Sequence, residues 1–236
     1  MRSGAKKMQA EKHQGKGLEY LTVVPDDYDE NRRYPLVIMV HGFGANMQDL
    51  AGLAPAINAR GYVYACPNAP IAFDLGAGHA GYGWASPRGE STPEEYATAE
   101  SLLGEFFDEV FQQFFVGPDN ALLLGFSQGG GMTYRCGLTR PDIFAGLVAL
   151  SATLPEKNIL EERLPADRTQ PIFIAHGLSD PLIPTETAQE AKAFLEGAGY
   201  SPEYHEYAMA HEISGEVLRD VVPWIAQVLP PLDNMS

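Results

Sequence analysis

The sequence predicts an α/β fold in which a mostly parallel central sheet carries helices on both faces. From Gly17 onward, short β-rich runs alternate with longer segments of helical periodicity. Several of the short runs, such as LVIMV and ALLLG, are continuously apolar, as is typical of strands covered on both faces. No internal repeat and no Gly/Ser-rich linker divides the chain. We therefore expect one domain over residues 17–230, without a large separate cap domain.

The individual elements follow from the apolar runs and the breaks between them. The expected strands are Leu18–Val24, Pro35–His41, Tyr62–Cys66, Ala121–Gly125, Leu147–Ser151, Ile172–His176 and Glu203–Tyr207. The expected helices are Gln48–Ala59, Pro93–Phe115, Gln128–Leu138, Thr185–Leu195 and Glu212–Val228, the last bent or interrupted by Pro223. The clearest is the helix from Pro93, because Thr92 and Glu95 have the spacing of a capping box and an apolar stripe follows.

One long segment, Ile71–Ser91, fits neither pattern. It is rich in glycine and carries Phe73, Tyr82 and Trp84. Long irregular connections in compact domains often serve function, so we expect this segment to form a wall of the substrate site. The alternative is a surface excursion packed by its own aromatic side chains.

Charge and composition exclude several classes of function. The net charge is −15, and five of the 16 basic residues precede Gly17. From Gly17 onward 11 basic residues face 30 acidic ones, a net charge of −19. Such a body repels phosphate backbones and anionic lipid surfaces, so neither nucleic-acid binding nor stable membrane association is expected.

The ends of the chain and its cysteines indicate a cytoplasmic protein. Residues 1–16 are basic and lack apolar periodicity, which predicts a flexible arm, and residues 231–236 are expected to form a short tail. No run of about 18 apolar residues and no secretory signal is found. Cys66 and Cys136 lack the spacing of a disulfide framework or a metal site and are expected to be buried thiols.

The strongest chemical signal is Gly125-Phe126-Ser127-Gln128-Gly129, a G-x-S-x-G pattern between an expected strand and an expected helix. A sharp turn here would force Ser127 into strained backbone angles, while the flanking glycines remove Cβ atoms that would otherwise collide. The serine hydroxyl would stand at a helix N-terminus, where negative charge is favoured. The pattern therefore predicts a nucleophilic serine.

A serine nucleophile needs a histidine base and a carboxylate that orients it. Of the six histidines, only His211 follows the last expected strand and precedes the last helix, at the sheet edge where the elbow lies. Asp180 follows the strand Ile172–His176 and so emerges at the same edge, whereas Asp142 and Asp167 do not directly follow a strand. The order Ser127, Asp180, His211 is that of an α/β-hydrolase triad.

Catalysis by a serine also needs N–H donors for the oxyanion of the tetrahedral intermediate. The backbone N–H of Gln128, directly after the nucleophile, is one expected donor. The backbone N–H of Phe43, in the glycine-flanked turn after the strand Pro35–His41, is the other.

With these motifs together, the chain resembles the phospholipase/carboxylesterase family of α/β-hydrolases, from about Tyr34 to Ile225. The resemblance rests on HGFGAN at 41–46, GFSQGG at 125–130, HGLSDPLIP at 176–184 and HEIS at 211–214. It implies the α/β-hydrolase fold, the triad and oxyanion donors named above, and no cofactor. It also implies that Trp84 and Leu182 contact the substrate. The sequence departs from the family at Ala210, where glycine is common, and at Ala45-Asn46, where many relatives have aspartate.

We therefore expect a serine carboxylesterase that hydrolyses short- to medium-chain esters of small, neutral molecules through an acyl-enzyme, with no metal. Homodimer formation is left open. An acyl-protein thioesterase or lysophospholipase activity is the nearest alternative, because the same acyl chemistry serves another leaving group. A binding protein that has lost catalysis is a second alternative, disfavoured by the intact triad. A metal-dependent hydrolase is a third, disfavoured because no closely spaced histidine pair occurs.

Overall fold

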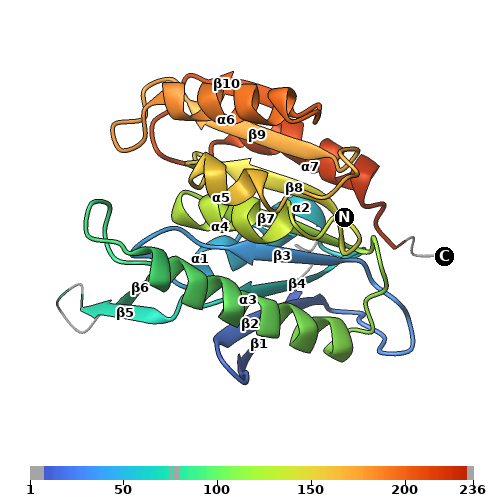
Figure 1. Ribbon diagram of the computed structural model, residues 1–236. Helices are drawn as coiled ribbons and strands as arrows, with labels where there is room; N and C mark the ends of the chain where they lie inside the picture. Colours follow the sequence, from blue (N-terminus) through green and yellow to red (C-terminus); the bar gives the residue numbers. More distant parts are fainter. Residues whose placement is uncertain (1–7, 75, 77–79, 233–236) are drawn as a thin grey trace.

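The structure, a computed structural model, describes residues 8–74, 76 and 80–232, and its centre is a single large sheet (Figure 1). Within the described residues this sheet has the strand order β1-β2-β4-β3-β7-β8-β9-β10. Its strands are β1 (Met8–Gln14), β2 (Glu19–Pro25), β3 (Leu36–Val40), β4 (Val63–Pro67), β7 (Ala121–Phe126), β8 (Phe144–Leu150), β9 (Ile172–Gly177) and β10 (Glu203–Tyr207). The pairs β1–β2 and β2–β4 are antiparallel, and every pair from β4 to β10 is parallel.

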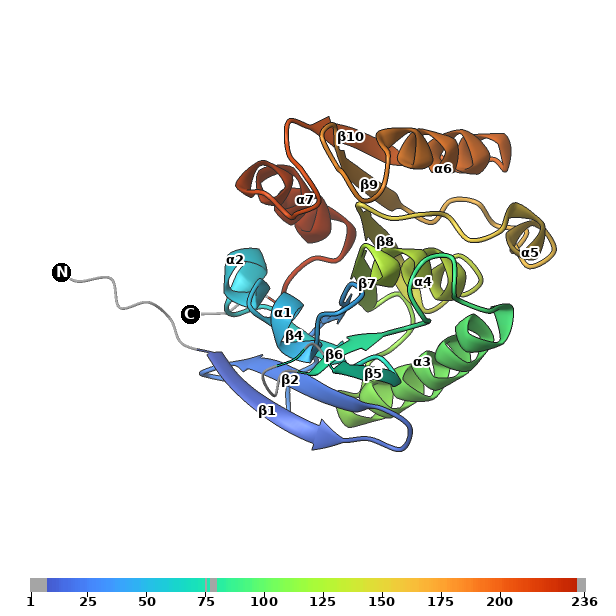
Figure 2. The same cartoon turned by 90° about the vertical axis from the view of Figure 1, so that its left-hand side faces the viewer.

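Helices cover both faces of this sheet, as Figure 2 shows. On one face lie α1 (Met47–Ala51), α2 (Ala54–Asn58) and α7 (Gly215–Val228). On the other lie α3 (Pro93–Gln113), α4 (Gln128–Gly137), α5 (Lys157–Glu161) and α6 (Thr185–Gly197). The predicted fold class, a mostly parallel sheet between two helical layers, is confirmed. The strand order and connections are those of an α/β-hydrolase.

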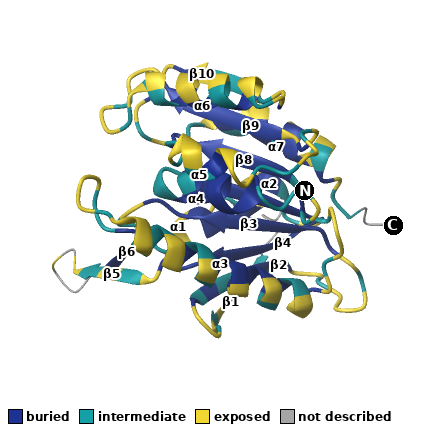
Figure 3. Ribbon diagram, in the orientation of Figure 1, coloured by how far each residue is buried: buried dark blue, intermediate teal, exposed yellow. Residues whose placement is uncertain are grey.

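The core consists of two apolar layers, one on each side of the sheet, which makes the central strands the most buried part of the molecule (Figure 3). Every residue of β3 and β4 is buried, which explains their continuous apolar sequences. Phe106 and Phe107 of α3 pack into one layer, and Val221 and Ile225 of α7 into the other. Burial on both faces fixes the strand ends, and these ends carry the candidate site.

The sequence also left some elements unpredicted. The flexible arm expected over residues 1–16 is wrong for residues 8–14, which form the edge strand β1. His13 of this strand stacks on Tyr20 and hydrogen-bonds the Thr22 hydroxyl, so pairing with β2 orders a polar segment. Residues 1–7 lie outside the described part. At the other end, Leu232 donates its backbone N–H to Gly61 O, so this part of the expected tail packs on the domain, and residues 233–236 are not described.

Three further differences have local causes. The helix expected over Gln48–Ala59 is two short helices, α1 and α2, divided before Pro55. The helix α7 continues through Pro223 without interruption. The segment Ile71–Ser91 is not wholly irregular, because β5 (Ile71–Asp74) pairs with β6 (Ala80–Gly83) in a small antiparallel hairpin.

Candidate active site

Ser127 lies in a sharp turn between β7 and α4. Its φ and ψ angles are 55° and −119°, in the left-handed region that side chains rarely adopt. A Cβ atom at Gly129 would lie 2.1 Å from Val40 O, so only glycine lets the first turn of α4 come this close to β3. The strained turn holds the Ser127 side chain above the carboxyl ends of the strands.

His211 reaches Ser127 from the loop between β10 and α7. The Ser127 Oγ atom is 2.9 Å from His211 Nε2, and His211 Nδ1 is 2.6 Å from Asp180 Oδ2. The Phe126 ring packs against the imidazole with 4.8 Å between ring centroids. Three side chains that lie 31 to 84 residues apart thus form one continuous hydrogen-bonded relay.

Both carboxylate oxygens of Asp180 have hydrogen-bond partners. Its side chain is buried, and Oδ1 accepts the backbone N–H groups of Leu182 and Ile183 at 2.8 and 2.9 Å. Burial by itself raises the pKa of this carboxyl group, but the hydrogen bonds from Ile183, His211 and Leu182 outweigh it, so the pKa lies below its usual value. Asp180 is therefore an ionised, fixed acceptor for the Nδ1–H of His211.

The loops that carry Asp180 and His211 are tied to each other and to a second buried histidine. The backbone N–H groups of Leu178 and Ser179 bond Tyr207 O and Met209 O. His176 is fully buried, and its Nε2 lies 2.8 Å from Ile183 O and 3.5 Å from Asp180 Oδ2. Because a carbonyl oxygen only accepts, His176 carries its proton on Nε2 and braces the loop of Asp180.

Two residues that line the same cavity as Ser127, Phe43 and Gln128, have backbone N–H groups without a partner in regular structure. Gln128 is the first residue of α4, so its N–H has no partner within the helix. Phe43 N–H has no hydrogen-bond acceptor among the described residues. A Cβ atom at Gly42 would lie 3.2 Å from Ser127 Cβ, which shows how closely the loop after β3 approaches the turn at Ser127. Free N–H groups at this place suit a developing oxyanion.

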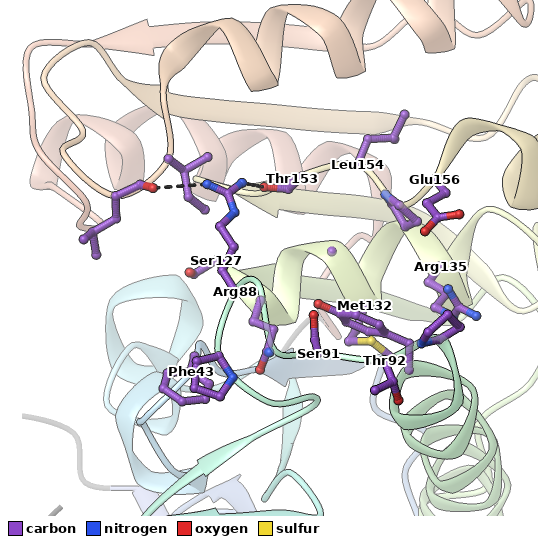
Figure 4. Close-up of a pocket in the computed structure, with 18 of the residues that line it drawn as sticks. Phe43, Arg88, Ser91, Thr92, Ser127, Met132, Arg135, Thr153, Leu154 and Glu156 are labelled. Carbon is purple, nitrogen blue, oxygen red and sulfur yellow. Dashed lines mark hydrogen bonds between the residues drawn. The ribbon is translucent and has the colours of Figure 1, made fainter.

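These groups open into a cavity of about 500 Å³, drawn in Figure 4. Ser127 lies at one end, and Met132 and Arg135 lie toward the other. The lining also includes Gln128, Ile159 and His211. Leu182, predicted to contact the substrate, lines the cavity and is 64% exposed.

Trp84 does not line the cavity, and the expectation that it contacts the substrate is wrong. Its side chain is fully buried, and Nε1–H donates to His41 O at 2.9 Å. His41 is buried too: its Nε2 accepts the Ala69 N–H, and burial lowers its pKa. Trp84 therefore supports the loop of Phe43 from behind, because Phe43 follows His41 by only two residues.

We call residues 84–92 the rim segment. It supplies Pro87, Arg88, Ser91 and Thr92 to the cavity lining, so part of the segment expected to form a wall does so. The Gln128 side chain brackets it, accepting the Trp84 N–H at 2.7 Å and donating to Ala85 O at 2.9 Å. The far end is fixed to α3 by the predicted capping box, in which Glu95 also accepts from the Ser86 hydroxyl.

The sequence missed two roles here. The Gln128 side chain and Arg88 act through contacts with residues that lie 43 to 94 positions away in the chain, which no local pattern reveals. The sequence did offer one sign of the role of Arg88: it is an isolated arginine in a glycine-rich segment of an acidic chain. The other histidines have structural surroundings where described: His13 in β1, His41 and His176 in the core, and His205 stacked on Phe173. His79 lies outside the described residues.

Two departures from the family pattern also have a structural account. Asn46 is the N-cap of α1, and its side chain accepts the Gln48 N–H at 2.8 Å, a role that an aspartate fills as well. Ala210 is exposed, so its methyl group does not disturb the loop of His211. Among the described residues no cluster of metal-binding side chains occurs, and none of the helices there is long and apolar enough to cross a bilayer.

The sheet order, the strained turn at Ser127 and its imidazole partner define a serine hydrolase of the α/β-hydrolase fold. The chain belongs to the phospholipase/carboxylesterase family, whose sequence model matches residues 23–229. Resemblance to that family, predicted from four motifs, is thereby confirmed.

Comparisons with individual proteins agree. The chain is 27% identical to acyl-protein thioesterase 1 of Kluyveromyces lactis over 212 residues, which cover 82% of this chain and 92% of that protein. It is 32% identical to carboxylesterase SOBER1 of Arabidopsis thaliana over 114 residues, 48% of this chain and 50% of that protein. The crystal structure of esterase PE8 superimposes with a TM-score of 0.74 at 21% identity, covering 94% of this chain and all of that one. At that identity the structural likeness supports the fold alone.

Proposed function

We propose that this protein hydrolyses short- to medium-chain carboxylic esters through an acyl-enzyme on Ser127. The observation that carries the proposal is the relay from Asp180 Oδ2 through His211 to Ser127 Oγ, with contacts of 2.6 and 2.9 Å, at the end of an open cavity. The volume of about 500 Å³ suits a small molecule. Curated relatives named carboxylesterases and thioesterases support the same chemistry.

The geometry supports a two-step mechanism. Asp180 holds the Nδ1–H of His211, which leaves Nε2 unprotonated and facing the Ser127 hydroxyl. His211 takes the Ser127 proton as Oγ forms a bond to the ester carbonyl carbon, and the N–H groups of Phe43 and Gln128 stabilise the oxyanion. His211 then gives its proton to the departing alcohol as the ester C–O bond breaks.

Deacylation repeats these steps with water. His211 removes a proton from a water molecule, the water oxygen attacks the acyl carbonyl, and the bond to Ser127 Oγ breaks as the proton returns to Oγ. The products are the alcohol and the carboxylic acid. This sequence needs no cofactor.

The test is a comparison of Ser127→Ala with Ser201→Ala, an exposed serine between α6 and β10. With p-nitrophenyl butyrate we expect the Ser127 variant to lose at least about 10⁴-fold in kcat, and the Ser201 variant to retain wild-type activity. A fluorophosphonate probe should label every form except Ser127→Ala. Absence of labelling and of esterase activity in the wild type would favour a binding protein.

A thioesterase acting on acylated proteins is the second candidate, supported by the likeness to acyl-protein thioesterase 1 over most of both chains. Matched acyl esters and thioesters separate the two. A kcat/KM that is much higher for the thioester than for the ester would reverse the proposed order.

A further inference from the structure

Arg88 places a positive charge at the mouth of the cavity. It belongs to the rim segment, is exposed, and extends across to the opposite wall (Figure 4). Its guanidinium group donates to Thr153 Oγ1 at 3.2 Å and to Leu182 O at 3.4 Å. Both acceptors are uncharged and both contacts are long, so most of the N–H groups of Arg88 remain available.

Of the other charges around the cavity, the arginine is paired with a carboxylate and the carboxylate lies apart from Arg88. The arginine, lysine, aspartate and glutamate side chains in its lining are Arg88, Arg135 and Glu156. Arg135 Nε bonds Glu100 Oε2 at 2.7 Å, and Glu100 also pairs with Arg163. Figure 4 draws Glu156 apart from Arg88, and Glu156 forms no ion pair among the described residues. Within the described part of the chain, no carboxylate forms an ion pair with Arg88.

The lining thus carries a charge opposite to that of the chain as a whole, which is −15. Charges far from the cavity act weakly there, because salt at physiological strength screens exposed charges beyond about 8 Å. The expectation of a neutral ester came from the whole-chain charge. The cation at the mouth of the cavity is a guanidinium without a carboxylate partner in the described residues, so its charge counts for more at the site than the charge of the distant surface.

We infer that the ester hydrolysed at this site carries a free carboxylate, which Arg88 binds while Ser127 attacks the ester carbonyl. The inference rests on the proposed esterase function and names its substrate class. A planar guanidinium offers parallel N–H groups that match the two oxygens of a carboxylate. Since no second unpaired cation lies beside Arg88 in the described lining, one negative charge suits the site better than a doubly charged phosphate.

Arg88 could instead serve only as a latch between the rim segment and the opposite wall, through Thr153 and Leu182. The two roles predict different kinetics. Loss of a latch would alter the hydrolysis of charged and uncharged esters equally, whereas loss of a carboxylate-binding group would affect only the charged ester.

The experiment uses two pairs of substrates, each a free acid and its methyl ester, which differ in the negative charge and otherwise only by one methyl group. In the first pair the charge is on the acyl side: mono-4-nitrophenyl adipate and its methyl ester. In the second it is on the leaving group: 4-butyryloxybenzoate and its methyl ester. Wild type should prefer the acid in at least one pair by about tenfold in kcat/KM, equivalent to about 1.4 kcal/mol. The preference should fall in molar salt, because the guanidinium is exposed.

Arg88→Gln should abolish this preference while leaving the uncharged esters within about threefold of wild type. The control is Arg60→Gln, which makes the same change in charge at an exposed arginine outside the cavity lining. This variant should keep the preference of the wild type. Equal rates for acid and methyl ester in both pairs, or an equal loss for both in Arg88→Gln, would overturn the inference and leave the esterase proposal standing.

Binding gives a readout that does not depend on turnover. Monomethyl adipate should bind Ser127→Ala about tenfold more tightly than the double variant Ser127→Ala/Arg88→Gln in calorimetry, equivalent to about 1.4 kcal/mol. Equal affinities would overturn the inference. Failure of the wild type to hydrolyse any of the four esters would overturn the proposed function, and the inference with it.

Discussion

The loops after β7, β9 and β10 and the rim segment face each other across one cavity, but different forces hold them in place. The first group is positioned by the backbone: the strained turn at Ser127, N–H bonds to Asp180 from two and three residues away, and backbone bonds that join the loops of Asp180 and His211. The rim segment is held by side-chain contacts between distant parts of the chain, such as those of Gln128 with residues 84 and 85. We infer that the backbone around Ser127 and Asp180 sets the positions of these side chains, while the shape of the pocket depends on side-chain packing between distant parts of the chain.

The largest effect should come from Asp180→Asn, which leaves the fold intact and damages the relay. An amide cannot hold the Nδ1–H tautomer of His211 as a carboxylate does, so kcat should fall by about 10⁴-fold. The measurement is steady-state hydrolysis of p-nitrophenyl butyrate. Asp142→Asn, the same change at an exposed carboxylate, is the control and should be silent. A loss of less than tenfold would show that Asp180 does not orient His211.

Gly129→Ala tests whether local backbone geometry sets the position of Ser127. The new methyl group would meet Val40 O at 2.1 Å and His41 O at 2.5 Å, which are backbone atoms of a buried strand end. We expect a loss of about 3 kcal/mol or more in the free energy of unfolding, measured with urea. Gly197→Ala in α6 has no atom within 4 Å of the added Cβ and should be neutral or stabilising. Similar results for both variants would contradict the close approach at the elbow.

Trp84→Phe tests whether long-range contacts of the rim segment support the loop of Phe43. It removes the Nε1–H donor and leaves the buried His41 O without that partner, which should destabilise the protein by about 1–3 kcal/mol. Because Phe43 follows His41 closely, kcat should fall more than KM rises. Trp224→Phe, at a tryptophan on the opposite face of the sheet, should leave kcat unchanged. A Trp84 variant with raised KM and normal kcat would instead indicate substrate contact.

A smaller, pH-dependent effect is expected from the ionisation of Asp180, whose pKa is lowered because hydrogen bonds outweigh burial. A carboxylate with a folded-state pKa below its unfolded value of about 4 stabilises the fold fully above that value. The contribution is lost as pH falls through the folded-state pKa. The stability difference between wild type and Asp180→Asn should therefore shrink in denaturant titrations below about pH 4. A difference that stays constant from neutral to acid pH would contradict this.

Leu182→Ala should have the smallest effect. Leu182 is 64% exposed, so little apolar area is lost, and kcat/KM for longer acyl chains should fall by no more than about threefold. Leu178→Ala is the matched control, because Leu178 is 55% exposed but does not line the cavity. A p-nitrophenyl ester series of increasing chain length gives the measurement, and equal effects of the two variants would argue against substrate contact at Leu182.

The same contrast explains what the sequence could predict. The fold class, the central strands and the meeting of Ser127, Asp180 and His211 follow from apolar runs and from the rule that parallel strands end at one edge. Strand β1 was missed because its residues, MQAEKHQ, are polar and mostly exposed, so its order comes from pairing with β2. Trp84 was misplaced because a tryptophan in a glycine-rich segment gives no local sign of which side it faces.

The residues of the candidate site follow five consecutive strands of the sheet, from β3 to β10 in its spatial order. Phe43 follows β3, Ser127 follows β7, Thr153 follows β8, Asp180 follows β9 and His211 follows β10. The relay needs all four neighbouring strands from β7 to β10, because β8 separates the serine strand from the aspartate strand and His211 follows the edge strand β10. Recovery of activity after dilution from denaturant would therefore report the docking of the edge strand β10. A fragment that ends before β10 lacks His211 and would have no activity.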